Sequence, residues 1–246
     1  MFRHVLAHAG EHPALAAGQA PPGLLSPREE AILAGLVLLP RRRKWLLGRW
    51  AAKRLLGELA AEDSGLMSGF LGKPGSNQDW RCQFSVLNDE LGAPYVERRG
   101  GRLPLSLSIS HRGDWGLAAI ALSPGASIGA DLETVEPRDP ALVRQFFSES
   151  EADRVNKTGG RDADRAVARI WSAKEAVLKA MGIGLRHDTR DILVGDEGNA
   201  PAGLAEGWRA LDIRLAPVLA AQIAPRSLTV LWRDLDAHVV TVALLM

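Results

Sequence analysis

Two carboxylates stand close together in the middle of the chain, in the stretch Ile128-Gly129-Ala130-Asp131-Leu132-Glu133. The apolar residues around Asp131 and Glu133 predict a β-strand, and residues two apart on a strand project from the same face. Two like charges side by side favour a bound cation. The competing interpretation is an exposed acidic edge of a sheet.

A second group of polar side chains lies on a predicted helix. Trp171, Glu175 and Lys179 are spaced four residues apart, so an aromatic ring, a carboxylate and an ammonium group share one helical face. The alternative is an ordinary Glu-to-Lys helix pair, worth about 0.2–0.5 kcal/mol, beside a half-buried tryptophan.

A third group follows a segment in which Leu105, Leu107 and Ile109 alternate with serines. This strand runs into a turn that carries Ser110, His111 and Arg112. Hydroxyl, imidazole and guanidinium groups at one tip can hold a phosphate. A polar turn with a capping histidine is the alternative.

Basic residues are also concentrated on one helix, predicted from Arg41 to about Leu59. The cluster consists of Arg41, Arg42, Arg43, Lys44, Arg49, Lys53 and Arg54. It is either an anion-binding surface or a solvated helix face, and the solvated interpretation is kept for Arg41 and Arg54.

The elements that must position these groups follow from periodicity and turn signals. Residues 1–25 show no periodic pattern and are expected to be a loosely ordered lead-in. Ser26-Pro27 starts a helix that is predicted to reach about Leu39. The turn Ser123-Pro124-Gly125 divides the remainder into subdomains at 26–124 and 125–246. A second long helix, about 162–181, precedes a set of strands, so the pattern favours an α+β fold.

The composition is that of a soluble globular protein, with 46% hydrophobic and 24% charged residues among 246. The lone Cys82 fits a reducing compartment, and no apolar run approaches the ~20 residues of a membrane span. We therefore expect a cytoplasmic protein with no membrane association. A nucleic-acid-binding protein, suggested by the basic helix, is disfavoured by a net charge of +1.

Taken in order, these segments resemble the signature of the 4'-phosphopantetheinyl transferases, in particular the pseudo-dimeric surfactin-synthetase-activating type. The family pattern is Gly-x-Asp-x-Glu followed by Trp-x-x-Lys-Glu-x-x-x-Lys. This chain has Gly129 to Glu133 and Trp171 to Lys179 at the family spacing, with Phe146-Phe147-Ser148 and Glu151 between them. The resemblance covers about residues 26–181.

The resemblance implies two similar subdomains, each a long helix packed on a small, mostly antiparallel sheet, with the active site in the cleft between them. Asp131, Glu133 and Glu175 would bind Mg²⁺, or Mn²⁺ in its place. Asp131, Glu175 and Lys179 would be catalytic, with Glu175 as candidate base and Lys179 at the leaving group. Lys44, Arg43, Ser110, His111 and Lys179 would bind coenzyme A.

The implied reaction moves the 4'-phosphopantetheine group of coenzyme A onto a serine of an apo acyl or peptidyl carrier protein and releases 3',5'-ADP. The pathway, whether fatty acid, polyketide or nonribosomal peptide synthesis, stays open, and a monomer is expected. The alternative is a catalytically silent relative that binds coenzyme A or a carrier protein.

One departure from the family motivates that alternative. The family has Gly-Lys-Pro or Gly-Arg-Pro before the histidine motif, whereas this chain has Gly92-Ala93-Pro94. A basic contact to the nucleotide phosphate is therefore missing at Ala93. Arg98, Arg99 and Arg102 are the nearby candidates to replace it.

Overall fold

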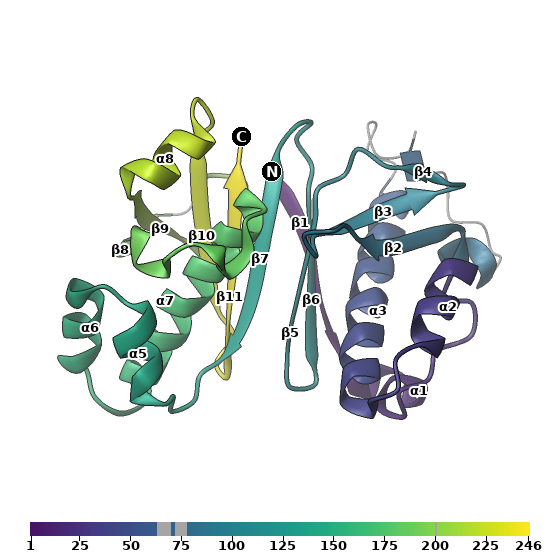
Figure 1. Cartoon of the computed structure of the whole chain (residues 1–246), viewed down its shortest axis with the longest axis horizontal. Coiled ribbons are helices and arrows are strands. Elements are labelled where there is room, and N and C mark those ends of the chain that lie inside the picture. The colour runs from purple at the N-terminus through teal and green to yellow at the C-terminus, as the bar shows by residue number, and fades with distance from the viewer. Residues whose placement is uncertain (63–69, 72–77, 200) are drawn as a thin grey trace. The chain divides into compact units, whose positions relative to one another are not determined.

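The computed structural model describes residues 1–62, 70–71, 78–199 and 201–246. The chain forms two compact units, Met1–Gly125 and Ala126–Met246. Each unit packs a long helix against an antiparallel sheet, so the predicted α+β class is confirmed (Figure 1).

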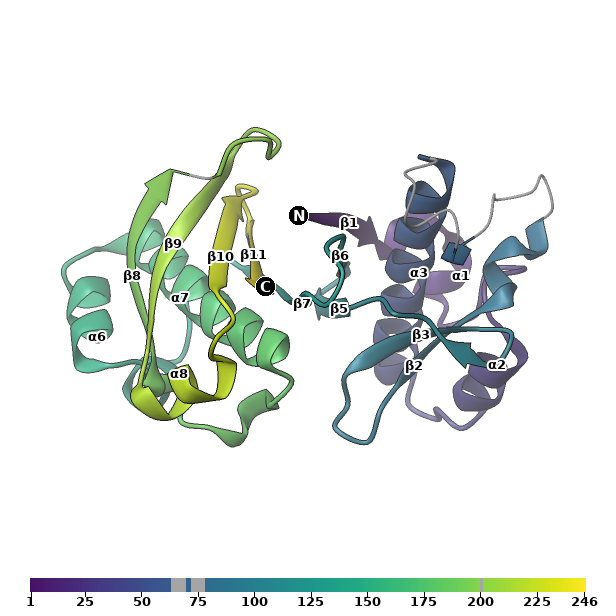
Figure 2. The same cartoon turned by 90° about the horizontal axis from the view of Figure 1, so that it is seen from above.

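Unit 1 contains a three-stranded sheet in the order β1-β6-β5 and a second sheet in the order β2-β3-β4. Its strands are β1 (Phe2–His8), β2 (Phe84–Asn88), β3 (Pro94–Arg98), β4 (Gly101–Arg102), β5 (Leu107–Arg112) and β6 (Trp115–Ala121). Its helices are η1 (Ala9–Glu11), α1 (Pro13–Ala16), α2 (Pro27–Ala34), α3 (Leu39–Ala61) and η2 (Gln78–Gln83). The helix α3 lies beside β1, β6 and β5 (Figure 2).

The long basic helix α3 packs a row of apolar side chains into the core of unit 1. Leu47, Ala51, Leu55 and Leu59 recur every four residues and are all buried in the core of unit 1. The preceding helix α2 ends at Ala34 rather than near Leu39, because the chain turns at Gly35 before α3 begins.

The N-terminal segment is ordered, contrary to the expected loose lead-in over 1–25. Strand β1 pairs antiparallel with β6 over its whole length, from Phe2 opposite Ala121 to His8 opposite Trp115. Leu15 and Leu24 are buried further along the segment. Its burial pattern is irregular, so sequence periodicity could not reveal a strand that only its partner defines.

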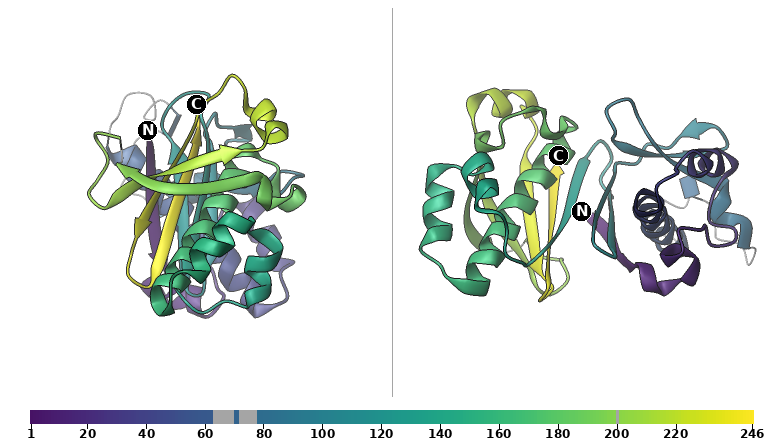
Figure 3. Two further views of the ribbon diagram at one scale, coloured as in Figure 1. Left: turned by 90° about the vertical axis from the view of Figure 1, so that its left-hand side faces the viewer. Right: turned by 60° about the horizontal axis from the view of Figure 1, so that its bottom comes forward.

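Unit 2 is a five-stranded antiparallel sheet in the order β7-β11-β10-β9-β8. Its strands are β7 (Ser127–Thr134), β8 (Ile192–Asn199), β9 (Trp208–Leu215), β10 (Leu228–Asp234) and β11 (His238–Leu245). Its helices are α5 (Pro140–Phe146), α6 (Glu149–Asn156), α7 (Gly160–Met181), η3 (Gly184–Arg186), η4 (Thr189–Asp191) and α8 (Pro217–Ile223). The sheet is strongly twisted, so that green β8 and β9 run across the direction of yellow β11 (Figure 3).

The helix α7 lies directly on β7 and β11. A Cβ atom on Gly129 of β7 would come within 1.8 Å of the carbonyl oxygen of Ala176 and 2.4 Å of the backbone nitrogen of Ala180. Only glycine permits this approach of strand to helix. The helix ends at Gly182, whose φ of 70° is the left-handed cap conformation that glycine adopts without strain.

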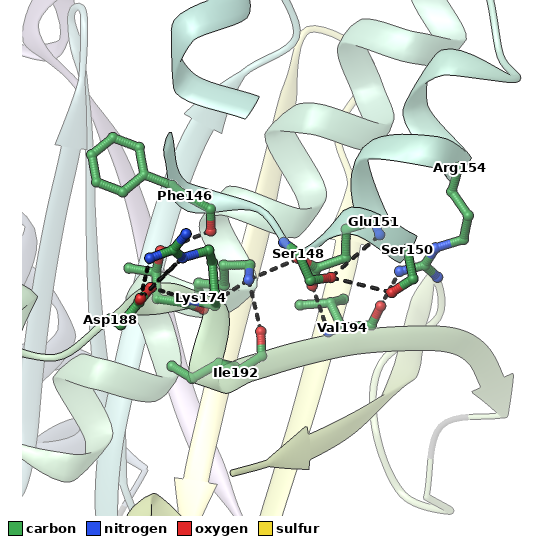
Figure 4. Close-up of polar contacts among 11 residues, drawn as sticks. Phe146, Ser148, Ser150, Glu151, Arg154, Lys174, Asp188, Ile192 and Val194 are labelled. Carbon is green, nitrogen blue, oxygen red and sulfur yellow. Dashed lines mark hydrogen bonds and ion pairs between the residues drawn. The ribbon is translucent and has the colours of Figure 1, made fainter. Parts of the chain in front are cut away.

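Each unit also contains a fully buried lysine that joins its long helix to a helix cap. In unit 2, Lys174 of α7 lies 2.9 Å from Glu151, which completes the capping box begun by Ser148 and accepts the backbone N–H of Val194 (Figure 4). In unit 1, Lys53 of α3 contacts Glu29, the capping-box partner of Ser26, and Glu29 accepts the backbone N–H of Val86.

In each of these buried ion pairs the lysine also donates hydrogen bonds to backbone carbonyl oxygens. Lys174 donates to the carbonyl oxygens of Thr189 and Ile192 at 2.8 and 2.7 Å, and Lys53 donates to that of Leu24 at 2.6 Å. A buried charge is tolerated when it is paired and hydrogen-bonded in this way. The described helices include none that is both long enough and apolar enough to cross a lipid bilayer.

Candidate active site

The carboxylate pair and the helical lysine meet where α7 crosses β7. The ammonium group of Lys179 lies 2.6 Å from Oδ1 of Asp131 and 3.3 Å from Oε2 of Glu175. It also donates to the backbone carbonyl oxygen of Ala130 at 3.3 Å. Lys179 thus sits against a carboxylate of the strand and a carboxylate of its own helix.

Burial makes these charges strongly interdependent. Asp131 is 2% exposed, whereas the side chains of Glu175 and Lys179 are 23% and 29% exposed. Burial and the charge of Asp131 raise the pKa of Glu175, and Lys179 opposes them. Burial alone would lower the pKa of Lys179, but Asp131 and Glu175 outweigh it and raise that pKa. The cluster is therefore held together by a lysine that stays charged.

Glu133 lies on the same strand, two residues beyond Asp131, and is 7% exposed. Its Oε2 atom is 2.5 Å from Nη2 of Arg138, which also donates to the carbonyl oxygen of Thr134 at 3.1 Å. Although β7 is an edge strand of its sheet, Asp131 and Glu133 are buried. An exposed acidic edge, the competing interpretation of this pair, is not what the strand presents.

The described residues include no group of three or more histidine, cysteine, aspartate or glutamate side chains gathered to hold a metal ion. Here Lys179 and Arg138 neutralise Asp131 and Glu133. The donor chemistry still fits a hard cation, because carboxylate oxygens are the ligands that Mg²⁺ prefers. Asp131, Glu133 and Glu175 are the residues that could hold one.

A pocket of about 620 Å³ lies in unit 1, between the start of α3, the tip of β5 and the turn after β2. It is lined by Leu38, Pro40, Arg41, Lys44, Trp45, Gly48, Arg49, Asn88, Gly92, Pro94, Ile109 and His111. None of these lining residues is acidic. Cations, an imidazole and an aromatic ring together can bind an anionic group attached to a flat apolar body.

The pocket brings together Lys44 and His111, which the sequence singled out as binding residues. It also contains Arg41, for which a solvated face was expected, and Arg49, which was a member of the basic cluster without an assigned role. Positions 41, 45, 48 and 49 fall on one helical stripe, so the sequence did contain a signal for these residues. Arg54 is on another part of the helix and pairs with Glu11 at 2.6 Å.

Other predicted residues lie near these sites without lining them. Ser110 is buried on β5, where strand alternation turns its side chain to the face opposite Ile109 and His111. Arg43 is exposed on α3 and is absent from the pocket lining. Trp171 packs against Phe146, with ring centroids 5.0 Å apart, so it supports α7 from the core of unit 2.

The arginines expected to replace the missing basic residue do not reach the pocket. Arg98 donates to the carbonyl oxygen of Phe70 and lies over the ring of Phe84. Arg102 lies over Tyr95, 4.5 Å from the ring centroid. Neither these two nor Arg99 is among the lining residues.

A partly buried carboxylate–lysine cluster in one unit and a cationic, aromatic pocket in the other suit an α+β protein that acts on phosphate-bearing substrates. A family model described as the 4'-phosphopantetheinyl transferase superfamily matches residues 127–228. The 4'-phosphopantetheinyl transferase AcpT of Salmonella typhimurium is 30% identical over 74% of this chain and 75% of its own length. This chain therefore belongs to the 4'-phosphopantetheinyl transferase family.

Other relatives are similar over shorter stretches. A 4'-phosphopantetheinyl transferase of Bacillus subtilis is 29% identical over 51% of this chain and 54% of its own length, so the match spans about half of that protein. HetI of Nostoc is 27% identical over 70% of this chain and 66% of its own. The solved structure of AcpS from Neisseria meningitidis, 19% identical over 48% of this chain, has a TM-score of 0.38 and is too distant to bear on the site.

Proposed function

We propose that this protein transfers the 4'-phosphopantetheine group of coenzyme A to a serine of an apo acyl or peptidyl carrier protein. The serine oxygen forms a bond to the phosphorus of the pantetheine phosphate, and the bond from that phosphorus to the oxygen of 3',5'-ADP breaks. The reaction needs two groups. One accepts the proton that the serine loses, and the other neutralises the charge on the departing phosphate.

The cluster of Asp131, Glu175 and Lys179 carries this proposal. Glu175 accepts the serine proton, directly or through a water molecule, a role that suits a carboxylate whose pKa is raised. Lys179, kept charged by Asp131, stabilises the oxygen that leaves with 3',5'-ADP. Asp131, Glu133 and Glu175 would also hold Mg²⁺, or Mn²⁺ in its place, which when bound supplies charge stabilisation at the pyrophosphate.

The nucleotide end of coenzyme A is assigned to the pocket of unit 1. Lys44 and Arg41 provide positive charge at the phosphates, and His111 provides a hydrogen-bond donor. Trp45 offers an aromatic surface to the adenine ring. Arg43 and Ser110 belong to this proposal as flanking positions next to Lys44 and His111.

The test is mass spectrometry of purified apo carrier proteins from fatty acid, polyketide and nonribosomal peptide pathways. Each is incubated with the protein, coenzyme A and Mg²⁺, with EDTA as the control. A gain of one phosphopantetheine unit that EDTA abolishes is the expected result. No gain on any carrier, with coenzyme A still bound, would instead support the silent relative that the Ala93 departure suggests.

Replacing Glu175 by Gln is expected to abolish this transfer, because the amide cannot take the serine proton. The side chain is 23% exposed, so the substitution should leave the fold intact, as circular dichroism would verify. The control is Glu58→Gln, which makes the same change in the long helix of unit 1, at a carboxylate that pairs with Arg54 at 3.8 Å and lies outside the cluster. Retained transfer in Glu175→Gln would remove Glu175 from the catalytic set.

A further inference from the structure

Arg138 lies just beyond the strand that carries Asp131 and Glu133, in the connection between β7 and α5. Its Nη2 atom is 2.5 Å from Oε2 of Glu133 and donates to the carbonyl oxygen of Thr134 at 3.1 Å. Its Nη1 atom is 3.5 Å from Oε1 of Glu136. The guanidinium therefore contacts two carboxylates at once, one through each terminal nitrogen.

The two carboxylates differ in their access to water. The side chain of Glu133 is 9% exposed, that of Glu136 is 46% exposed, and that of Arg138 is 14% exposed. A buried carboxylate is costly without a countercharge, whereas water stabilises an exposed one. Arg138 thus supplies a countercharge that Glu133 requires and that Glu136 does not.

Glu133 is also one of the three carboxylates that could hold Mg²⁺. A divalent cation bound to Glu133 would supply the countercharge that Arg138 provides in this structure. It would also repel the guanidinium, because like charges a few ångströms apart in a partly buried site are poorly screened. Arg138 and the cation are therefore competitors for one carboxylate.

The backbone on either side of Arg138 is held in place, so a change of partner must come from its side chain. Thr134 ends β7 and pairs with His238 of β11. On the other side, Asp139 caps α5 by accepting the backbone N–H of Ala141 at 2.8 Å. Rotation about the side-chain bonds of Arg138 is enough to bring the guanidinium fully onto Glu136, which it already approaches.

We propose that Arg138 regulates divalent-cation binding by pairing with Glu133 in the metal-free protein and moving to Glu136 when the cation arrives. The inference rests on the proposed function, because it takes Asp131, Glu133 and Glu175 as the residues that hold the cation. Arg138 takes no part in the transfer itself. It acts through Glu133 and sets the concentration of metal at which the site fills.

The experiment titrates Mn²⁺, which carboxylate sites bind as they bind Mg²⁺, and follows the unbound ion by electron paramagnetic resonance. It is done with the protein alone and with coenzyme A at saturation, without carrier protein. Arg138→Met should tighten Mn²⁺ binding by about tenfold or more, because the competitor is gone. Glu136→Gln should weaken it by about two- to fivefold, because the displaced guanidinium loses its second partner.

The double variant separates this exchange of partners from a general effect of charge. If Glu136 acts through Arg138, adding Glu136→Gln to Arg138→Met should leave the Mn²⁺ affinity of Arg138→Met unchanged. If Glu136→Gln weakens binding equally in both backgrounds, its carboxylate attracts the cation directly and the exchange is overturned. Arg144→Met is the matched control, since it removes the same charge from an exposed position on α5.

Asp131→Asn identifies the site that is being titrated, because it removes a proposed metal-binding oxygen and should abolish the tight Mn²⁺ binding. If Arg138→Met does not fold, as judged by its melting curve, Arg138→Gln carries the test. The glutamine amide can still donate a hydrogen bond to Glu133 but has no charge. It should also tighten Mn²⁺ binding.

The two hypotheses fail in different ways. If the unaltered protein binds Mn²⁺ in neither titration, or if Asp131→Asn binds it equally well, the metal site of the proposed function is wrong and the role of Arg138 with it. If Mn²⁺ binds at Asp131 and the Arg138 variants change its affinity no more than Arg144→Met does, the proposed function stands and the role of Arg138 is overturned.

Discussion

Ala93 lies in the turn between β2 and β3, where two hydrogen bonds with Asp89 hold its backbone. Its N–H donates to Oδ1 of Asp89 at 2.9 Å, and its carbonyl oxygen accepts the backbone N–H of Asp89 at 3.0 Å. Its neighbours Gly92 and Pro94 line the pocket. A longer side chain at position 93 therefore starts from a rigid backbone at the rim of the pocket.

Ala93→Lys is expected to lower the KM for coenzyme A, by up to about tenfold, because it adds a charge-assisted hydrogen bond to the phosphate. Steady-state kinetics with a carrier protein would measure it. Ala93→Met has a similar length without the charge and is the control. A fall in KM for both variants would point to apolar contact with the nucleotide rather than to phosphate binding.

His238, at the start of β11, gives the protein a pH-sensitive contribution to stability. Burial lowers its pKa, and Glu136 opposes the shift only in part. The folded state therefore binds this proton less readily than the unfolded state, for which the pKa is about 6.5. Stability from His238 is complete above that pH and is lost as the pH falls below it.

His238→Gln is accordingly expected to flatten the loss of stability on acidification below about pH 6.5. Urea unfolding at a series of pH values would give the free energy of unfolding for both proteins. The difference in the free energy of unfolding between the two proteins should be constant at and above neutral pH. If the difference in the free energy of unfolding is the same at every pH, His238 is not a source of the pH dependence.

For single residues, the sequence predicts which side chains belong to the candidate site better than it predicts which side chains they contact. The family resemblance placed Asp131 in one site with Glu175 and Lys179, and Lys179 does contact both carboxylates. The contact between Glu133 and Arg138 was not predicted, because it depends on how the chain turns after β7. Arg49 was grouped with its exposed neighbours, since its burial comes from β2 and not from the helix.

Among the elements, β7 and α7 are joined by a contact that leaves no space for a side chain at Gly129. Gly129→Ala would place its Cβ atom against the backbone of Ala176 and Ala180 on α7. Because backbone atoms cannot rotate away, the helix must shift. The expected cost is at least about 1–3 kcal/mol, the usual range for an overpacked core.

The shift would also move Glu175 and Lys179 away from Asp131, so transfer activity should fall even in the population that stays folded. Urea unfolding and steady-state kinetics would separate the two effects. Gly198→Ala is the control, because this strand glycine has no heavy atom within 4 Å of the added Cβ. Normal stability and activity in Gly129→Ala would show that α7 can move without consequence.

Long helices were predictable from sequence because their apolar spacing repeats over many turns. The helix expected from Arg41 to about Leu59 corresponds to α3, and the one from about 162 to 181 corresponds to α7. Strand β1 was missed, because its seven residues lack alternation and its stability comes from β6, more than a hundred residues away. Pairing at that separation leaves no local signal.

At the scale of the whole molecule, each unit has a separate core. Residues from β1 to β6 form the hydrophobic clusters of unit 1, and residues from Phe147 to Leu245 form that of unit 2. Each unit contains a buried ion pair, Lys53 with Glu29 in unit 1 and Lys174 with Glu151 in unit 2. The two pairs are therefore probes for the stability of their own units.

Lys53→Met and Lys174→Met are each expected to cost about 3–5 kcal/mol, because a buried carboxylate loses its countercharge. Hydrogen exchange followed by mass spectrometry should place the loss of protection in 1–125 for the first variant and in 126–246 for the second. Adding Glu29→Gln or Glu151→Gln to the matching variant should restore part of the stability. Protection lost equally throughout the chain would contradict separate cores.

The matching ion pairs also reveal a correspondence between the two units. Ser26, Glu29 and Lys53 recur in the same order, at nearly the same offset, as Ser148, Glu151 and Lys174. The hairpin of β5 and β6 pairs with β1 as that of β10 and β11 pairs with β7. Such agreement is what a tandem duplication of one unit would produce. The two units differ at the site itself, because Glu175 and Lys179 of unit 2 correspond to Arg54 and Glu58 of unit 1. One scaffold thus occurs twice in the chain, with different charged side chains on its two long helices.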